Sequence, residues 1–307
     1  MTGGFSQCDE EFMRWYGERY GYVFLPPVSD LKEIVARFAA RLNGVVLFDE
    51  EDVQGRVAAY NLASHRELLP VPARMYRERA DVFSAFPVVG HVSCAGEELS
   101  AVYARLMKEF LPACSREEMF SLGYRYRRAD GKLRTNFNYW GLDRAVRERQ
   151  FIFLLSCNER RRGSYDFMVE GSPEEYAVFA ELLRSFTGCC ALGGWNEPEW
   201  RWAAEAARFG HFVYCTDGAF NLSFHAAVPC GRTQFPFNKP RRAYGKPKNK
   251  VYITITANEG DTPKMASQLY NNAWLSARRG EVPVNWAFNP YHCRALPALA
   301  EYYLEPA

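Results

Sequence analysis

The sequence lacks several patterns that would place it at once in a familiar class of protein. Its nine cysteines include no Cys-x-x-Cys pair and are odd in number, which argues against both a zinc ribbon and a complete disulfide framework. We therefore expect reduced and mostly buried thiols. The five histidines also lack the spacing of metal ligands, so we expect neither a metal on His225 or His292 nor a cofactor.

Long apolar runs and an excess of charge of one sign are also missing. No run reaches the ~18 apolar residues of a membrane span, and the first residues do not show the basic and then apolar pattern of an export signal. The formal charge of +2 creates no global field for nucleic acid or an anionic membrane. A basic stretch at residues 232–250 is interpreted as a solvated connector, because no nucleic-acid fold signature accompanies it. We expect no nucleic-acid partner and no membrane partner.

Apolar and aromatic residues, by contrast, are plentiful. They make up 48% and 15% of the chain, which is typical of a globular protein with a sizeable core. At ~100–200 residues per domain, the length predicts two modules. The segment "GYRYRRADGKLRTNFNYWGLD" carries turn signals and marks the predicted boundary. We therefore predict an N-terminal α/β domain over residues 1–140 and a C-terminal domain over residues 145–307.

The N-terminal region alternates between helical and strand-like patterns. The segment "LKEIVARFAARLNG" predicts a helix with Ser29 or Asp30 as its cap, and "VVLFDE" predicts a buried strand. A second helical stretch near residues 53–64 follows. After it come the apolar run "FPVVGHVS" and the helix-like "GEELSAVYARLMKEFLPAC". This alternation implies a parallel sheet.

The C-terminal region repeats the alternation more regularly. Predicted strands are "QFIFLLSCN", "CCALGGWN", "HFVYCTDG", "VYITITA" and "VPVNWAFNP", and mostly helical segments separate them. Five such units predict an incomplete (β/α) barrel-like domain, although an open doubly wound sheet gives the same string. The predicted fold class is α/β.

Polar and aromatic side chains follow each of these predicted strands. In both architectures, ligands bind at the carboxyl ends of the strands. Carboxylates transfer protons or act as nucleophiles, amides bind hydroxyl groups, and Trp rings stack on apolar faces, so the set suits a carbohydrate. The predicted catalytic residues are Glu259, Asp261 and Glu199. The predicted substrate-binding residues are Trp195, Asn221, His225, Asn258, Trp286 and Asn289.

Each predicted acid also has a structural alternative. Thr262 followed by Pro263 can begin a helix, and Asp261 can assist the same helix N-terminus. Glu199 follows Pro198 at another predicted helix start. Glu259, however, lies before any cap, and a turn at Gly260 is what would bring both acids to the mouth of the barrel.

Several segments resemble one known family in the same order along the chain. "VYITITANEGDTPKM" resembles a strand followed by a Ser-Asp-Gly-Asp-Asn motif in the GxGYxYP family of putative glycoside hydrolases. "LGGWNEPEW", "TDGAFNLSFHAA" and "NGVVLFDEEDVQGRVAAYNLASHRELLPV" are similar to other parts of that family. The resemblance implies an N-terminal α/β region, a barrel-like domain, a role in carbohydrate breakdown and export from the cytoplasm.

The chain departs from the family pattern in two places. Its motif reads Asn258-Glu259-Gly260-Asp261-Thr262, and it stops at Ala307 before the expected Gly-x-Gly-Tyr-x-Tyr-Pro signature. We interpret the chain as a truncated relative. A barrel broken after its fifth strand exposes edge backbone groups, so we expect a partner chain or an altered closure to cover them.

The leading hypothesis is a glycoside hydrolase that acts through paired carboxylates. A non-catalytic carbohydrate-binding or interaction module is the alternative, because the acidic motif is altered. Metal-dependent deacetylation is disfavoured, because the sequence has no His-x-x-x-His pair.

Overall fold

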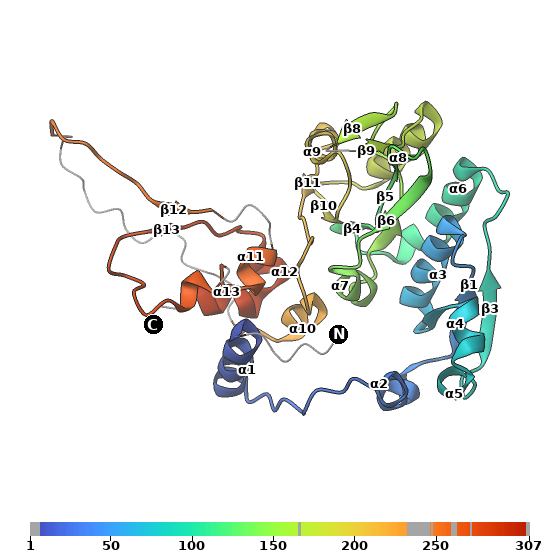
Figure 1. Ribbon diagram of the computed structural model, residues 1–307, viewed down its shortest axis with the longest axis horizontal. Helices are drawn as coiled ribbons and strands as arrows, with labels where there is room; N and C mark the ends of the chain where they lie inside the picture. The colour runs from blue at the N-terminus through green and yellow to red at the C-terminus, as the bar shows by residue number, and fades with distance from the viewer. Residues whose placement is uncertain are drawn as a thin grey trace. The chain divides into compact units, whose positions relative to one another are not determined.

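The contacts within the chain define two compact units. In the computed structural model, residues 7–164, 167–231, 246, 248–258, 263–270 and 272–304 are described. The larger unit comprises Pro26–Cys215, and the smaller unit comprises Met1–Leu25 together with Thr216–Ala307. Each unit is described by itself below, with its elements labelled in Figure 1. The domain division at residues 140–145 stays a prediction.

A three-stranded parallel sheet opens the larger unit. Its strands are β1 (Val45–Phe48), β2 (Leu69–Pro72) and β3 (Val88–Val92), in the order β2-β1-β3. The predicted helix before β1 is present as α2 (Leu31–Phe38) and the 3-10 helix η1 (Ala39–Arg41), and the Asp30 carboxylate caps it by accepting from Lys32 N at 3.0 Å. The other helices of this region are α3 (Val53–Arg66), α4 (Ala73–Glu78), α5 (Ala80–Phe83), α6 (Leu99–Phe110) and η2 (Leu111–Ala113).

A four-stranded parallel sheet forms the second part of the larger unit. Its strands are β4 (Glu118–Ser121), β7 (Phe151–Phe153), β10 (Ala191–Gly194) and β11 (Phe212–Val213), in the order β11-β10-β4-β7. Helices α7 (Leu142–Arg147), α8 (Pro173–Ser185) and α9 (Glu199–Arg208) accompany them. The predicted strands β7 and β10 are therefore not neighbours, because β4 lies between them and pairs with both.

An antiparallel sheet includes the turn-rich segment that follows β4. Strands β5 (Gly123–Arg127) and β6 (Leu133–Phe137) form a hairpin, and β8 (Arg162–Ser164) and β9 (Phe167–Val169) extend it in the order β6-β5-β9-β8. Asp130 and Gly131, two of the turn signals of this segment, lie in the loop between β5 and β6.

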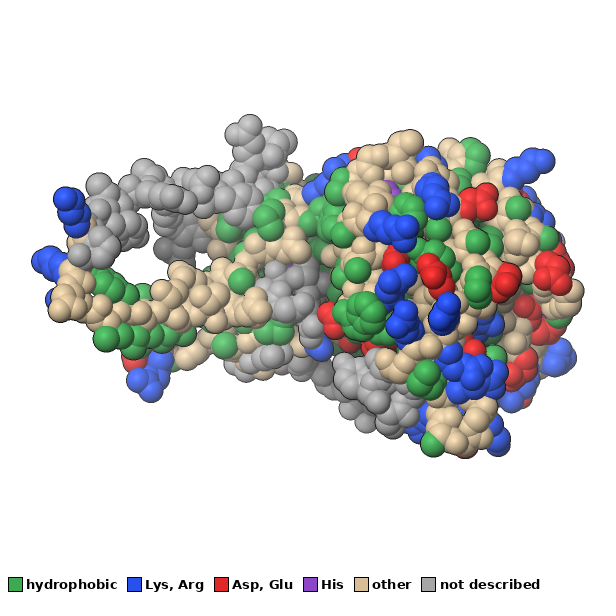
Figure 2. All heavy atoms as spheres, turned by 90° about the horizontal axis from the view of Figure 1, so that it is seen from above, with side chains coloured by type: hydrophobic (Ala, Val, Ile, Leu, Met, Phe, Trp, Pro, Cys, Tyr) green, Lys and Arg blue, Asp and Glu red, His purple; other side chains and the backbone are tan. Residues whose placement is uncertain are grey.

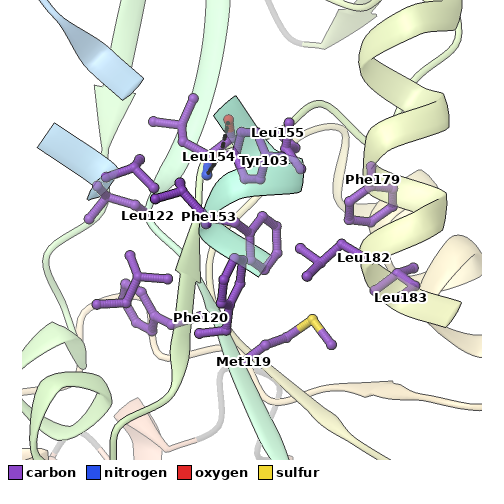
Figure 3. Packing of buried hydrophobic residues seen from close by; sticks show 14 of the residues in the cluster. Tyr103, Met119, Phe120, Leu122, Phe153, Leu154, Leu155, Phe179, Leu182 and Leu183 are labelled. Carbon is purple, nitrogen blue, oxygen red and sulfur yellow. Dashed lines mark hydrogen bonds between the residues drawn. The ribbon is translucent and has the colours of Figure 1, made fainter. Parts of the chain in front are cut away.

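The main core lies between β4, β7, α6 and α8. Figure 3 shows Phe120, Phe153, Phe179 and Leu182 packed together, and each is at most 1% exposed. Burying a side chain of this size contributes roughly 1.5–3 kcal/mol, so this cluster is the principal source of stability in the unit.

Two buried polar side chains pair with the backbone along the outer edge of β7. The Asn61 amide, on α3, donates to Ile152 O at 2.8 Å and accepts from Ile152 N at 3.0 Å. The Tyr103 hydroxyl, on α6, does the same for Leu154, at 3.2 and 2.9 Å (Figure 3). Both side chains are 0% exposed, so they satisfy backbone groups that no water could reach.

The smaller unit is mostly helical. Its elements are α1 (Gln7–Tyr20), α10 (Leu222–Ala227), β12 (Thr256–Ala257), α11 (Lys264–Ser267), η3 (Ala273–Leu275), β13 (Asn285–Trp286), α12 (His292–Ala295) and α13 (Pro297–Leu304). Strands β12 and β13 are parallel. Helix α1 is joined to α13 by Glu301, which accepts from Arg19 at 2.5 Å and from the Tyr20 hydroxyl.

Two predicted elements of the smaller unit are much shorter than expected. The long helix predicted after Thr262 ends at Ser267, because Leu269, Tyr270 and Asn272 all adopt positive φ angles. The strand predicted at residues 251–257 is reduced to Thr256–Ala257. Val251 and Ile253 are 88% and 82% exposed, so the apolar face expected there is not buried within the described residues.

The predicted α/β class is confirmed. The described residues form parallel sheets with helices, and no sheet among them closes into a barrel. Figure 2 shows basic and acidic side chains interspersed on the face in view. No helix in the described part of the chain is long and apolar enough to cross a membrane.

Candidate functional site

The carboxyl edge of the four-stranded sheet gathers polar side chains from three strand ends. Gly194 of β10 lies beside Ser121 of β4, which lies beside Phe153 of β7, so the three strands end at a common level. The loops that follow supply the remaining residues. We call this group the carboxyl-edge cluster: Ser121, Cys157, Asn158, Trp195, Asn196 and Glu197.

Gly194 allows β10 to turn into this cluster. Its φ angle is +82°, and a Cβ atom at this position would lie 1.9 Å from Ser121 O. Only glycine fits both the conformation and the close approach. The residue after it, Trp195, donates its backbone N–H back to Ser121 O at 3.4 Å.

Asn196 ties the three strand ends together. Its amide nitrogen donates to Leu155 O, beyond β7, at 2.9 Å and to the Ser121 hydroxyl at 3.3 Å. Its amide oxygen accepts from Glu197 N at 2.9 Å. Asn196 is 0% exposed, so this network holds the edge in one arrangement.

Glu197 orients the Trp195 ring. Its carboxylate accepts from the Trp195 indole N–H at 3.2 Å and from Glu199 N at 3.2 Å, and it is 4% exposed. The Trp195 ring also packs edge-on against Trp202, with centroids 6.0 Å apart. The Glu197–Pro198 peptide bond is cis. Because both ends of the ring are fixed, Trp195 presents a defined, partly buried surface.

The predicted catalytic residue Glu199 differs from Glu197 in its access to solvent. It is the first residue of α9, and its side chain is exposed. The sequence pattern led to Glu199 and not to Glu197. The signal for Glu197 was available in the Trp-Asn-Glu-Pro order directly after a buried strand.

Cys157 is buried within the cluster and is not a reactive thiol. It is 0% exposed, and its Sγ lies 3.6 Å from Glu197 O. Burial raises the pKa of the Cys157 thiol to about 12. The thiolate needed for nucleophilic attack is therefore scarce at neutral pH.

An ion pair between Glu175 and Arg125 holds the loop after β7 in place. Glu175, at the start of α8, accepts from Ser156 N at 2.9 Å and from Arg125 of β5 at 2.6 Å. Next to Ser156, the Asn158 amide nitrogen donates to Glu197 O at 3.4 Å. The antiparallel sheet thus supports the carboxyl-edge cluster through Arg125.

The smaller unit contains two of the predicted binding residues at α10. Asn221 adopts a left-handed conformation with φ 55° before α10 and is exposed. His225 is 6% exposed, its Nδ1 lies 2.7 Å from the Tyr16 hydroxyl, and its ring packs against Phe12. The Tyr16 contact fixes the His225 ring against α1.

The other predicted residues of the smaller unit surround β12 and β13. Asn258 is exposed after β12. Trp286 packs edge-on against Tyr270 and Trp274, at 5.1 and 5.0 Å between centroids. Asn289 is partly buried, and its side-chain oxygen accepts from the backbone N–H two residues later at 2.9 Å.

Glu259 and Asp261 lie outside the described residues. Their expected convergence with Glu199 on one rim therefore stays a prediction, as does a partner chain that completes the barrel. Among the residues that the structure describes, no group of three or more His, Cys, Asp or Glu side chains is placed to hold a metal ion.

The fold and the cluster define an α/β protein of the class that carries its polar groups at the carboxyl ends of parallel strands. Residues 249–307 match the family model of the GxGYxYP putative glycoside hydrolase C-terminal domain. The resemblance seen in the sequence is confirmed over that segment.

One solved structure has a fold similar to that of this chain. The chain is similar to the crystal structure of a putative hydrolase from Bacteroides thetaiotaomicron VPI-5482, with a TM-score of 0.73 and 13% sequence identity. The match covers 99% of this chain and 54% of the other, so the chain spans about half the length of that structure. No curated protein matches this chain.

Proposed function

We propose that this chain acts on a carbohydrate as a glycoside hydrolase. The observation that carries the proposal is the match of residues 249–307 to a glycoside hydrolase domain family, because this segment contains both Glu259 and Asp261. Glycoside hydrolysis needs a pair of carboxyl groups on either side of the scissile bond. The larger unit supports the proposal with a fixed Trp195 ring and the exposed carboxylate of Glu199.

In this proposal Glu259 and Asp261 supply the paired carboxylates. One protonates the leaving oxygen, and the other either attacks the anomeric carbon or activates a water. Carboxyl groups about 5–5.5 Å apart give retention of configuration, and groups about 6.5–9.5 Å apart give inversion. Glu199 is the further acid of the proposal, because its exposed side chain is accessible, whereas Glu197 is engaged in positioning Trp195.

The sugar-binding groups follow from their chemistry. Trp195 and Trp286 offer ring faces for stacking, and Asn221, Asn258 and Asn289 offer amides for hydroxyl groups. His225 is fixed by Tyr16, so in this proposal its part is to position α10.

Glycan hydrolysis by the purified chain tests the proposal. The substrates are a panel of plant, fungal and bacterial glycans, and the readout is the release of reducing ends. Glu259→Gln and Asp261→Asn each remove a carboxylate with little change of shape, and we expect each to lower the rate at least ~10²-fold. The matched control is Glu281→Gln, which removes an exposed carboxylate that binds Arg278 at 2.8 Å in the same unit. The proposal fails if the wild type releases no product from any glycan.

The alternative function is carbohydrate binding without turnover. It is favoured by the closed network of the carboxyl-edge cluster, in which the Asn196 amide oxygen accepts from Glu197 N and the Glu197 carboxylate holds the Trp195 ring. Titration calorimetry separates the two functions. Heat of binding that saturates without product formation supports the binding module.

A further inference from the structure

A second polar recess lies in the larger unit. It is a cleft of about 1010 Å³ at the carboxyl end of β1, between the loop at residues 49–52 and the β5–β6 hairpin. Small-molecule sites commonly occupy about 300–1,000 Å³. The lining residues that matter below are Glu51, Gln54, Arg56, Arg125, Leu133 and Phe137.

The floor of the cleft is fixed by Asp52. This carboxylate caps α3 by accepting from Gly55 N at 2.7 Å, and its second oxygen accepts from Cys94 N at 2.6 Å and from the Ser93 hydroxyl at 3.0 Å. Because Ser93 and Cys94 follow β3, the hydrogen bonds of Asp52 link the segment after β1 to the segment after β3. The cleft is thus part of the rigid sheet edge.

One wall combines a cation with an aromatic ring. The Arg56 guanidinium lies 4.0 Å from the centre of the Phe137 ring and donates to the Tyr139 hydroxyl at 2.7 Å and to Glu50 O at 2.9 Å. Leu133, 46% exposed, extends the apolar part of this wall.

Three side chains of the cleft keep polar atoms without partners. Gln54 Oε1, Arg56 Nε and Arg125 Nε are shielded from solvent and bind no other group among the described residues. An unmade hydrogen bond on such an atom costs about 1–3 kcal/mol. A ligand that donates to Gln54 Oε1 and accepts from the two Nε–H groups would supply the hydrogen bonds that these atoms lack.

The charges around the cleft narrow the class of ligand. Asp49, Glu51 and Glu97 present exposed carboxylates there. Glu97 is paired with Arg105 at 3.0 Å and Asp49 lies 3.3 Å from His91, so Glu51 contributes most to the repulsion of an anion. Arg125 is already paired with Glu175, and Arg134 with Asp130. A neutral polyhydroxyl chain fits best, because its hydroxyl groups donate to carboxylates, accept from guanidinium groups and leave C–H faces for Leu133 and Phe137.

We propose that this cleft binds a neutral oligosaccharide. The inference goes beyond the proposed function, because it requires no turnover. The cleft also contacts the loop after β7. Gln54 donates to Leu154 O at 3.4 Å, and Arg125 reaches Ser156 through Glu175.

Calorimetry on the full chain tests the cleft. The probes are short oligomers of β-1,4-linked glucose, xylose and mannose and of α-1,4-linked glucose, with oligolysine as a cationic peptide and inorganic polyphosphate as an anion. Leu133→Trp fills the cleft from a position that is already exposed. The matched control is Val88→Trp, because Val88 is equally exposed at 46% but begins β3 at the opposite edge of the sheet.

We expect at least one neutral oligomer to bind, Leu133→Trp to weaken its affinity roughly tenfold or more, and Val88→Trp to leave it unchanged. The same calorimetry on Glu259→Gln prevents hydrolysis of the probe during the titration. Binding to the cleft is expected to persist in this variant. A failure of the cleft proposal can therefore be told apart from a failure of the hydrolase proposal. Absence of binding by every neutral oligomer, preferential binding of oligolysine or polyphosphate, or full affinity in Leu133→Trp would each overturn the inference.

Discussion

The two parallel sheets of the larger unit differ at their carboxyl edges. Beyond β4, β7 and β10, the buried side chains of Asn196 and Glu197 pair with neighbouring groups. Beyond β1, the carboxylates of Asp49 and Glu51 are exposed and line an open cleft. A closed polar network fixes geometry, whereas an open edge leaves groups available to a ligand.

The closed edge holds its side chains in fixed positions, whereas the open edge leaves its side chains accessible to a ligand. At the closed edge, the network leaves the Trp195 ring partly buried and the Glu199 side chain exposed. At the open edge, most of the lining groups are accessible, whereas Asp52 is committed to holding the strands. The closed edge should therefore be sensitive to substitution and the open edge tolerant.

The largest expected effect comes from Gly194→Ala at the closed edge. The new Cβ atom would lie 1.9 Å from Ser121 O, so β10 must move from β4, and we expect a loss of about 3 kcal/mol or more in the free energy of unfolding. Gly210→Ala is the control. Gly210 has a similar φ of +81°, and an added methyl group there would meet no atom within 4 Å, so only conformational strain of about 1–2 kcal/mol is expected. Equal losses in urea unfolding would contradict the account.

A smaller effect is expected from Asn61→Leu. Leucine leaves the N–H and C=O groups of Ile152 buried without partners, which costs about 2–3 kcal/mol. Asn43→Leu removes an exposed amide that donates to Arg66 O, and a change of about 0.5 kcal/mol is expected there. Denaturant midpoints of the two variants measure the contrast, and a neutral Asn61→Leu would show that β7 needs no partner at its edge.

The smallest effect concerns the reactivity of Cys157. Its folded pKa of about 12 lies above its ordinary value of 9, so the neutral thiol stabilises the fold below pH 9, and that contribution is lost as the pH rises toward 12. At mildly alkaline pH we expect iodoacetamide to label the exposed Cys189 first and Cys157 only after unfolding. Peptide mass mapping gives the order. Labelling of both at one rate in the native protein would show that the closed edge is open.

Much of this fold follows from local sequence patterns. Helix caps such as Asp30 and Ser172 and the apolar strands β1, β7 and β10 were predictable, because cap and strand signals act over a few residues. The central strand β4 was not predicted. It begins with Glu118, whose charge is satisfied by Arg144 at 2.6 Å and by Gln150, and such distant partners cannot be read from a local pattern.

Local patterns do not fix the detail of the carboxyl-edge cluster. The carboxyl ends of the strands indicated Trp195 and the acids after it. Which acid is buried depends on the turn that Gly194 permits and on the network around Asn196, and neither has a local signature. The helix expected after Thr262 is shorter than predicted, because Leu269 and Tyr270, which are both buried, adopt positive φ angles that no local pattern indicates.

The most direct measurement of the central claim is the rate of glycan hydrolysis by the wild type beside Glu259→Gln, Asp261→Asn and Glu281→Gln. The account predicts product release by the wild type and by Glu281→Gln, and a loss of at least ~10²-fold in the other two. Undiminished hydrolysis by both Glu259→Gln and Asp261→Asn, or none by the wild type, would contradict it.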